Sequence, residues 1–193
     1  METKEVILNR RSIRNYQTRP VSEEDLRDIL EAGLYAPSSV NLQPWYFVAV
    51  QKPEHMQILL EVMDEVATAV EPSFRVRFKN NPEVAEESTR FVRQLGNAPV
   101  CVLVFQLKPA YDKSPESIMQ SEAAAIENML LMASDKGIGS CWLTAPLETP
   151  VGARLRERLR EAFAPGKGEL VALVTLGYPA KTPKAPPGKR EGT

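Results

Sequence analysis

Apolar and polar positions along the chain predict both helices and strands. Two continuous apolar runs, PVCVLVFQ at 99–106 and ELVALVTLGYP at 169–179, predict strands at the centre of a sheet that is covered on both faces. A third run, WYFVAV at 45–50, is rich in aromatic and β-branched residues and lies between prolines, which indicates a shorter buried strand.

Apolar residues at helical spacing predict helices from Ser22 to about Gly33, from Ser114 to Lys136, and from Thr149-Pro150 through VGARLRERLREAF. Further helices begin at Pro53 and at 81–82. The segment 137–140, GIGS, is interpreted as a helix C-cap and turn, with a ligand-binding role as the open alternative. About six helices, three or four strands and no sustained βαβ alternation indicate an α+β fold in one domain, 1–193.

Composition is that of an ordinary globular protein, with 193 residues, 43% hydrophobic and 25% charged. A formal net charge of −1 argues against nucleic acid or an anionic membrane surface as partner. No apolar stretch has the length of a membrane span or the form of an export signal. Cys101 and Cys141 lie in apolar contexts that suit buried reduced thiols, so we expect a cytoplasmic protein.

Side chains that commonly perform catalysis are scarce. The single histidine, His55, is interpreted as an exposed bystander, and no CxxC pair, Walker loop or GxGxxG motif is present. No metal site is therefore expected. Two possibilities stay open: the protein is not an enzyme, or a bound cofactor carries the chemistry.

Positive charge is concentrated in RRSIR at 10–14, whose three guanidinium groups and one hydroxyl are the donors that hold a phosphate monoester. An ordinary basic surface patch is the alternative. The loop at 36–45, APSSVNLQPW, offers two hydroxyls and two carboxamides, which suit a polyol chain and the edge of a heterocycle.

Together, RRSIRNY, APSSVNLQPWYFV, GIGSCWLTAP and the basic tail after LGYPA closely resemble the FMN-dependent nitroreductase family over essentially the whole chain. The resemblance implies a nitroreductase-like fold, with a central mixed sheet flanked by helices, and an intertwined homodimer with two FMN sites at its interface. It implies an enzyme that works by ping-pong hydride transfer from NADH or NADPH, through flavin N5, to nitroaromatics, quinones or similar acceptors. The flavin then carries the reaction, and no protein side chain is expected to be catalytic.

The resemblance also implies the residues that bind FMN. The phosphate and ribityl chain are held by Arg10, Arg11, Ser12 and Arg14. Arg14 is directed toward the N1 and O2 side of the ring, where a cation stabilises the negative charge of the reduced flavin. The partner subunit donates a loop with Pro37, Ser38, Ser39, Asn41 and Gln43. The segment that reaches N5 contains Trp142, Leu143, Thr144 and Ala145, and the tail at 181–193 contributes Lys189 and Arg190.

Further expectations follow from the resemblance. The helix with alanines at 123–125 belongs to the dimer core, and the variable segment 64–95 covers the substrate side of the flavin. Two departures from the family are noted: the chain stops at Thr193, which puts exchange of a C-terminal arm in doubt, and Thr144 stands where some relatives carry an acid near N5. Other flavin reactions on this fold, such as dehydrogenation, dehalogenation or flavin-ring cleavage, stay open, as does a non-enzymatic anion-binding module.

Overall fold

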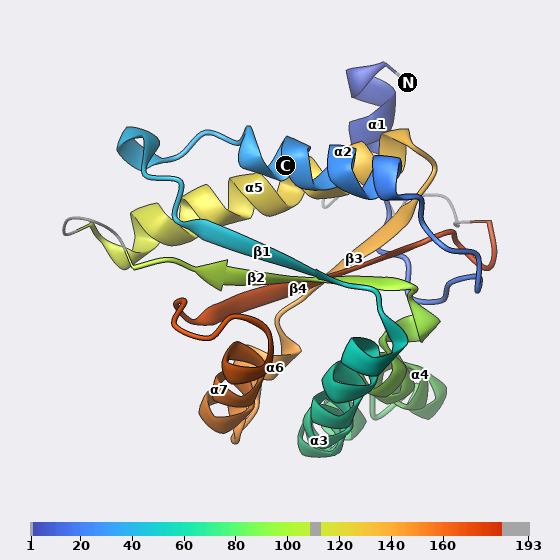
Figure 1. The fold of residues 1–193 in the computed structure, drawn as a ribbon. Helices are drawn as coiled ribbons and strands as arrows, with labels where there is room; N and C mark the ends of the chain where they lie inside the picture. The colour runs from blue at the N-terminus through green and yellow to red at the C-terminus, as the bar shows by residue number, and fades with distance from the viewer. Residues whose placement is uncertain (1, 109–112, 183–193) are drawn as a thin grey trace, which may run out of the picture.

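A computed structural model describes residues 2–108 and 113–182 (Figure 1). The strands are β1 (Trp45–Val50), β2 (Val100–Gln106), β3 (Gly139–Leu143) and β4 (Leu170–Gly177). The α-helices are α1 (Thr3–Asn9), α2 (Glu23–Leu34), α3 (Pro53–Arg77), α4 (Pro82–Gln94), α5 (Pro115–Asp135), α6 (Ala145–Glu148) and α7 (Gly152–Phe163). Two short 3-10 turns are η1 (Ser39–Asn41) and η2 (Leu95–Asn97).

The four strands form one sheet in the order β1-β2-β4-β3. All three pairings are antiparallel, so the four described strands form an antiparallel sheet and not the predicted mixed one. The parallel contact among the described residues is an isolated bridge between Ser12 and Ser140. The two long apolar runs form β2 and β4, the central strands, which confirms their prediction. The α+β class is confirmed as well.

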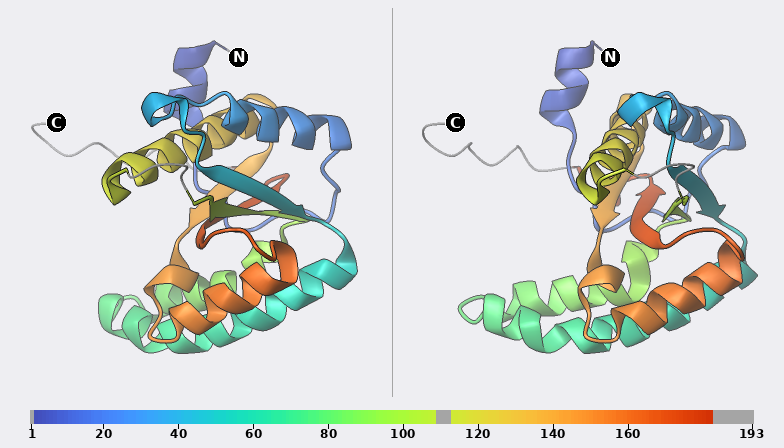
Figure 2. Two further views of the ribbon diagram at one scale, coloured as in Figure 1. Left: turned by 60° about the vertical axis from the view of Figure 1, so that its left-hand side comes forward. Right: turned by 90° about the vertical axis from the view of Figure 1, so that its left-hand side faces the viewer.

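Helices cover both faces of this sheet. Figures 1 and 2 show α2 and α5 on one face and α3, α4 and α7 on the other. Strand β2 divides its side chains between the two layers: Cys101, Leu103 and Phe105 pack with α3, α4 and α7, while the valines at 100, 102 and 104 pack with α2 and α5. Because successive side chains of a strand point to opposite faces, a strand between two helical layers must be apolar throughout.

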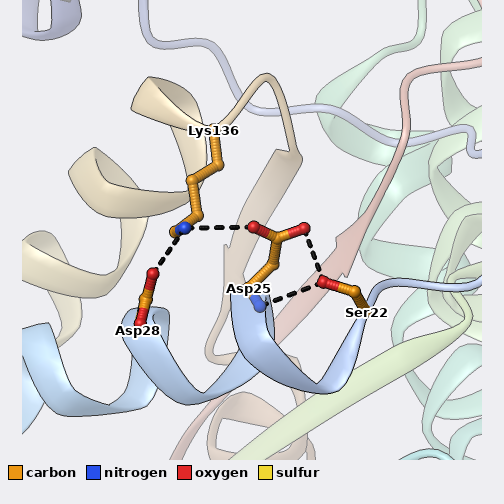
Figure 3. Close-up of polar contacts among 4 residues, drawn as sticks. All are labelled: Ser22, Asp25, Asp28 and Lys136. Carbon is orange, nitrogen blue, oxygen red and sulfur yellow. Dashed lines mark hydrogen bonds and ion pairs between the residues drawn. The ribbon is translucent and has the colours of Figure 1, made fainter.

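The layer of α2 and α5 is fixed by a polar cluster at one end (Figure 3). Ser22 caps α2 by accepting a hydrogen bond from the Asp25 amide at 3.0 Å, as the sequence predicts. The Lys136 ammonium, just beyond α5, lies 2.5 Å from Asp28 and 3.0 Å from Asp25. The Ser22 hydrogen bond and then Lys136 hold the pKa of Asp25 below its usual value. The start of α2 is thereby tied to the end of α5.

Three elements differ from the sequence-based prediction. Helix α1, which was not predicted, precedes RRSIR. In GIGS, Gly137 has φ of 70° and closes α5 as predicted. The second half of GIGS is not a turn, because β3 begins at Gly139. The helix predicted from Thr149 is preceded by the short α6 and begins at Gly152, where a Cβ would lie 2.6 Å from the Pro146 carbonyl oxygen. The chain must turn tightly there before a helix can continue.

Candidate functional site

The segment RRSIR lies along the outer edge of β3. The Ile13 amide donates to the Ser140 carbonyl oxygen at 2.8 Å, next to the bridge between Ser12 and Ser140. Gly139 permits this close approach, because a Cβ there would lie 2.7 Å from Cγ1 of Ile13. A glycine of GIGS therefore makes room for the arginine-rich segment, which the sequence pattern alone did not indicate.

The backbone that follows Arg14 also makes contacts with distant parts of the chain. The Tyr16 amide donates to the Gly96 carbonyl oxygen at 3.0 Å, and Tyr16 also bridges to Pro179 beyond β4. Gly96 has φ of 64°, and a Cβ on it would lie only 2.5 Å from the Arg14 carbonyl oxygen. The backbone of Arg14 is thus fixed from both sides, while its side chain is exposed.

The three guanidinium groups are in different surroundings. Nη1 of Arg11 donates to the carbonyl oxygens of Leu8 at 2.8 Å and Arg10 at 2.5 Å, which closes the C-terminal end of α1. Nε of Arg11 is buried and has no hydrogen-bond partner. The Arg10 side chain lies 3.4 Å from Glu127 of α5. An unsatisfied buried donor beside a second arginine is a position where an anionic ligand would bind.

Arg14 contacts the helical layer on the other side of the sheet. Its guanidinium lies 5.9 Å from the centre of the Phe91 ring, within the range of a cation–π contact. Phe91 belongs to α4, and α4 pairs with the second half of α3 to form the segment 64–95. That segment therefore reaches the arginine-rich region through one aromatic side chain.

The predicted segment 142–145 continues the same edge of the sheet. Since the carbonyl of Ser140 faces outward to Ile13, the alternation of an edge strand turns the amide and carbonyl of Trp142 outward too. The Trp142 side chain is 39% exposed, whereas Leu143 is buried and Ala145 half-buried. The outward backbone groups of Trp142 therefore lie along the same edge of the sheet as Arg10, Arg11 and Arg14. We call this region the arginine-rich strip.

Thr144 has a partner that the sequence did not indicate. Its hydroxyl donates to the Glu148 carboxylate at 2.5 Å, across the single turn of α6. Both side chains are exposed. A carboxylate is therefore present close to the predicted flavin segment, although Thr144 itself is not acidic.

The predicted loop 37–43 has an unusual backbone. Val40, Asn41 and Gln43 all have left-handed φ angles, of 49°, 57° and 47°. This conformation is tolerated by asparagine but is strained for a β-branched residue, and the Val40 side chain is 60% exposed. Strain at an exposed apolar residue points to a functional loop.

Internal hydrogen bonds fix the shape of this loop. The Gln43 amide donates to the Ser38 hydroxyl at 3.0 Å, and the Ser39 amide donates to the Ser121 hydroxyl of α5 at 3.1 Å. Pro37 is exposed at its start. The predicted polar residues thus occupy one ordered turn at the N-terminal part of α5.

One chain does not bring the loop and RRSIR together. The loop contacts α5 at Ser121, whereas Ser12 pairs with Ser140, beyond the other end of α5 (Figure 1). At 1.5 Å per residue, Ser121 lies about 9 Å along α5 from Glu127, which Arg10 contacts, and about 20 Å from the C-terminal end of the helix. Lys189 and Arg190 lie outside the described residues.

A buried carboxyl on α5 was not found from the sequence. Glu122 is only 4% exposed, and its Oε1 has no hydrogen-bond partner. Burial raises the pKa of Glu122 to about 7 from its usual 4.5. The available signal was its position four residues before Ile126, on the face of the helix that packs into the core.

The sequence-based expectations for His55 and for the two cysteines agree with the described residues. His55 is exposed and meets the edge of Phe163, and Cys101 and Cys141 are buried free thiols. Within 2–108 and 113–182, no group of three or more His, Cys, Asp or Glu side chains could hold a metal ion. None of the helices in these ranges has both the length and the apolarity to cross a membrane.

Comparison with known proteins identifies the family. Residues 7–178 match the model of the Nitroreductase family. A protein of Archaeoglobus fulgidus, provisionally named an NADH dehydrogenase/NAD(P)H nitroreductase, is 36% identical over 180 residues, which cover 92% of this chain and 86% of that protein. Iodotyrosine deiodinase 1 of Rattus norvegicus is 26% identical over 97% of this chain and 65% of its own length.

A solved structure agrees in fold over the full length. The nitroreductase of Bacteroides fragilis NCTC 9343, crystallised with bound FMN, is 30% identical, covers 100% of this chain and 97% of its own, and superposes with a TM-score of 0.75. The family match, the relatives and this structure agree, and the chain belongs to the nitroreductase family.

Proposed function

We propose that this chain is an FMN-dependent oxidoreductase that takes hydride from NADH or NADPH and passes it to a nitroaromatic, a quinone or a similar acceptor. The observation that carries the proposal is the arginine-rich segment clamped along the open edge of β3, with Arg14 exposed and Nε of Arg11 buried without a partner. The bound FMN of the Bacteroides fragilis relative supports the choice of cofactor.

The donors on this strip fit the parts of FMN. Arg10, Arg11 and Ser12 would hold the phosphate and the ribityl chain, because guanidinium groups bind phosphate oxygens in pairs. Arg14 would lie at the ring, and the outward backbone groups of Trp142 would bind its edge. Bound FMN supplies the two-electron redox chemistry, while the residues of the chain bind it, orient it and adjust its charge balance.

Turnover is the direct test of this function. We expect the purified protein with FMN to oxidise NADH or NADPH in the presence of nitro compounds and quinones, with the parallel double-reciprocal plots of a ping-pong reaction. Oxygen alone serves as the background acceptor. A flavin-loaded protein that oxidises neither nucleotide with any of these acceptors would refute the proposed activity.

Replacing Arg10 and Arg14 one at a time should distinguish an effect on FMN affinity from an effect on the flavin reduction potential. Arg10→Ala is expected to weaken FMN binding by about 1.5 to 3 kcal/mol, the contribution of a charged hydrogen bond. Arg14→Ala should lower the reduction potential of the bound flavin as well, because a cation beside the ring stabilises the negative charge gained on reduction. Equal potentials in Arg14→Ala and the parent, measured by redox titration, would contradict the role of Arg14.

A second copy of the chain would complete the site. Six of the twelve exposed large apolar side chains of the described residues lie on α1, at the end of α2, in the loop or on α5: Ile7, Leu8, Leu34, Tyr35, Val40 and Met119. Such a surface is typical of an interface. We propose a homodimer in which the strained loop 37–43 of each chain reaches the arginine-rich strip of the other.

Matched substitutions test this dimer. Met119→Glu, on α5, should weaken dimerisation at least about tenfold because it places a charge in an apolar interface. Val76→Glu, on α3 in the opposite layer, introduces the same charge at a side chain that is 76% exposed and should leave the dimer intact. Sedimentation velocity should give twice the mass of one chain for the parent and for Val76→Glu. A monomeric parent would overturn the dimer.

Two further expectations stay proposals. The segment 64–95 would cover the substrate side of the flavin as part of a single 1–193 domain, since its Phe91 already contacts Arg14. The two free buried thiols suit a reducing cytoplasm.

Reductive dehalogenation is a second candidate reaction, favoured by the likeness to iodotyrosine deiodinase 1. Adding an iodinated tyrosine to the acceptor panel distinguishes the two. Iodide release that outpaces reduction of nitro compounds would favour dehalogenation.

A further inference from the structure

A chain of buried hydroxyl groups lies directly beneath the arginine-rich segment. The Tyr16 hydroxyl is 2.6 Å from the carbonyl oxygen of Ile13 and 2.8 Å from the Thr175 hydroxyl. Tyr16 is 4% exposed and Thr175 is fully buried in β4. Both groups are satisfied if Thr175 donates to Tyr16 and Tyr16 donates to Ile13, because each hydroxyl carries one proton.

The tyrosine is a dependable donor. Burial raises the pKa of the Tyr16 hydroxyl far above its usual value of 10.0, and this outweighs the opposing hydrogen bond from Thr175. Burial therefore favours the protonated hydroxyl, which can donate to the Ile13 carbonyl oxygen. The Ile13 carbonyl would otherwise be a partly buried acceptor without this partner.

The bonded carbonyl belongs to the peptide group that carries Arg14. Because a peptide group is planar, fixing the Ile13 oxygen fixes the orientation of the Arg14 amide. The Ile13 amide is fixed by Ser140 on the other side, and the Arg14 carbonyl oxygen packs against Gly96. The Tyr16 hydroxyl thus contributes to the one orientation from which Arg14 projects over Phe91.

We propose that Tyr16 and Thr175 are positioning residues for Arg14: the hydrogen-bonded chain from Thr175 through Tyr16 to Ile13 orients Arg14 toward the flavin ring. This inference rests on the proposed FMN site. Both side chains are buried, so neither would contact the cofactor directly. Both act through the backbone of the arginine-rich segment, and their effect should therefore depend on the presence of Arg14.

Tyr16→Phe and Thr175→Val remove the hydroxyls with little change of shape. Each is expected to weaken FMN binding about two- to tenfold, the range for one lost neutral hydrogen bond, and to shift the flavin potential in the same direction as Arg14→Ala but less far. Thr175→Ser keeps the hydroxyl and should behave like the parent. Tyr178→Phe is the matched control, because its ring lies 3.8 Å from the Arg19 guanidinium and its hydroxyl is not one of the groups in the chain from Thr175 through Tyr16 to Ile13.

The decisive measurement is the flavin potential of proteins that carry two substitutions together. In an Arg14→Ala background, Tyr16→Phe should produce no further shift of the flavin potential, since the group that it positions is gone. Tyr16→Phe with Thr175→Val should have no more effect than the larger single change. Unfolding of each apoprotein in urea separates a general loss of stability from an effect on the site.

Four outcomes would count against the proposals. Parent-like affinity and potential in Tyr16→Phe, or a stability loss with an unchanged potential, would overturn the positioning role. Equal shifts by Tyr16→Phe with and without Arg14 would overturn it too, and if Tyr16→Phe does not fold, Thr175→Val and Thr175→Ser carry the same comparison. A parent protein that fails to bind FMN would instead refute the proposed function.

Discussion

Replacing Gly96 with alanine is expected to lower the free energy of unfolding by about 2 to 5 kcal/mol and to weaken FMN binding at least about tenfold. Gly96 has φ of 64°, and an added Cβ would lie 2.5 Å from the Arg14 carbonyl oxygen and 2.8 Å from its carbonyl carbon. Both contacts are to backbone, which cannot rotate away. The clash would therefore push Arg14 out of place or distort η2.

Gly137→Ala is a close control for this prediction. Gly137 also has a left-handed φ, of 70°, but a Cβ there would meet nothing within 4 Å. Its replacement should cost only the conformational penalty, about 1 to 2 kcal/mol, and should leave FMN affinity unchanged. Urea unfolding and FMN titration of both variants give the comparison. If Gly96→Ala behaves like Gly137→Ala in both measurements, the backbone contact with Arg14 does not define the site.

Glu122→Gln is expected to stabilise the protein by up to about 3 kcal/mol above pH 7 and to remove a pH dependence of stability. In the folded state the pKa of Glu122 is about 7, and in the unfolded chain it is about 4.5. The folded protein thus holds this proton more tightly. The contribution of Glu122 to stability is most favourable below pH 4.5, falls as the pH rises through 7, and is constant above that.

The difference in the free energy of unfolding between Glu122→Gln and the parent reports the contribution of this carboxyl, because all other titratable groups are the same in both proteins. Free energies of unfolding measured between pH 4.5 and 8.5 should diverge across the interval from about 4.5 to 7. Glu31→Gln, which removes an exposed carboxyl on α2, should show no such divergence. A constant difference between Glu122→Gln and the parent at all pH values would contradict a buried carboxyl with a raised pKa.

Much of the scaffold could be predicted because its signals are local. Apart from Gln106 and Thr175, the residues of β2 and β4 are apolar for the physical reason found in the structure, where both strands lie between two helical layers. Ser22 and Ser114 cap α2 and α5 as expected, since a capping hydroxyl acts on its own helix.

What could not be predicted depends on contacts between distant residues. Strand β3 starts with glycine and serine and has no strand pattern of its own; its place is determined by β4 on one edge and by Ile13 on the other. The environment of Glu122 and the hydrogen bond between Tyr16 and Thr175, 159 residues apart, follow only from packing.

The candidate site was predicted in its parts but not in its assembly. The run RRSIR was singled out from its charge, and the family resemblance assigned Arg14 to the flavin ring, but neither indicated what surrounds each arginine. In the structure Arg11 closes α1, Arg10 lies beside Glu127, and Arg14 alone of the three extends over Phe91. These differences arise from the tertiary fold and distinguish the roles proposed for Arg10 and Arg14.

Titration of the apoprotein with FMN tests the central claim most directly. We expect saturable binding of one FMN per chain, followed by flavin absorbance, and bleaching of the bound flavin when NADH or NADPH is added without oxygen. Arg10→Ala should shift the binding curve to higher FMN concentration. A protein that is colourless as purified, and that neither binds added FMN nor bleaches it with either nucleotide, would contradict the assignment of this chain as a flavin-dependent oxidoreductase.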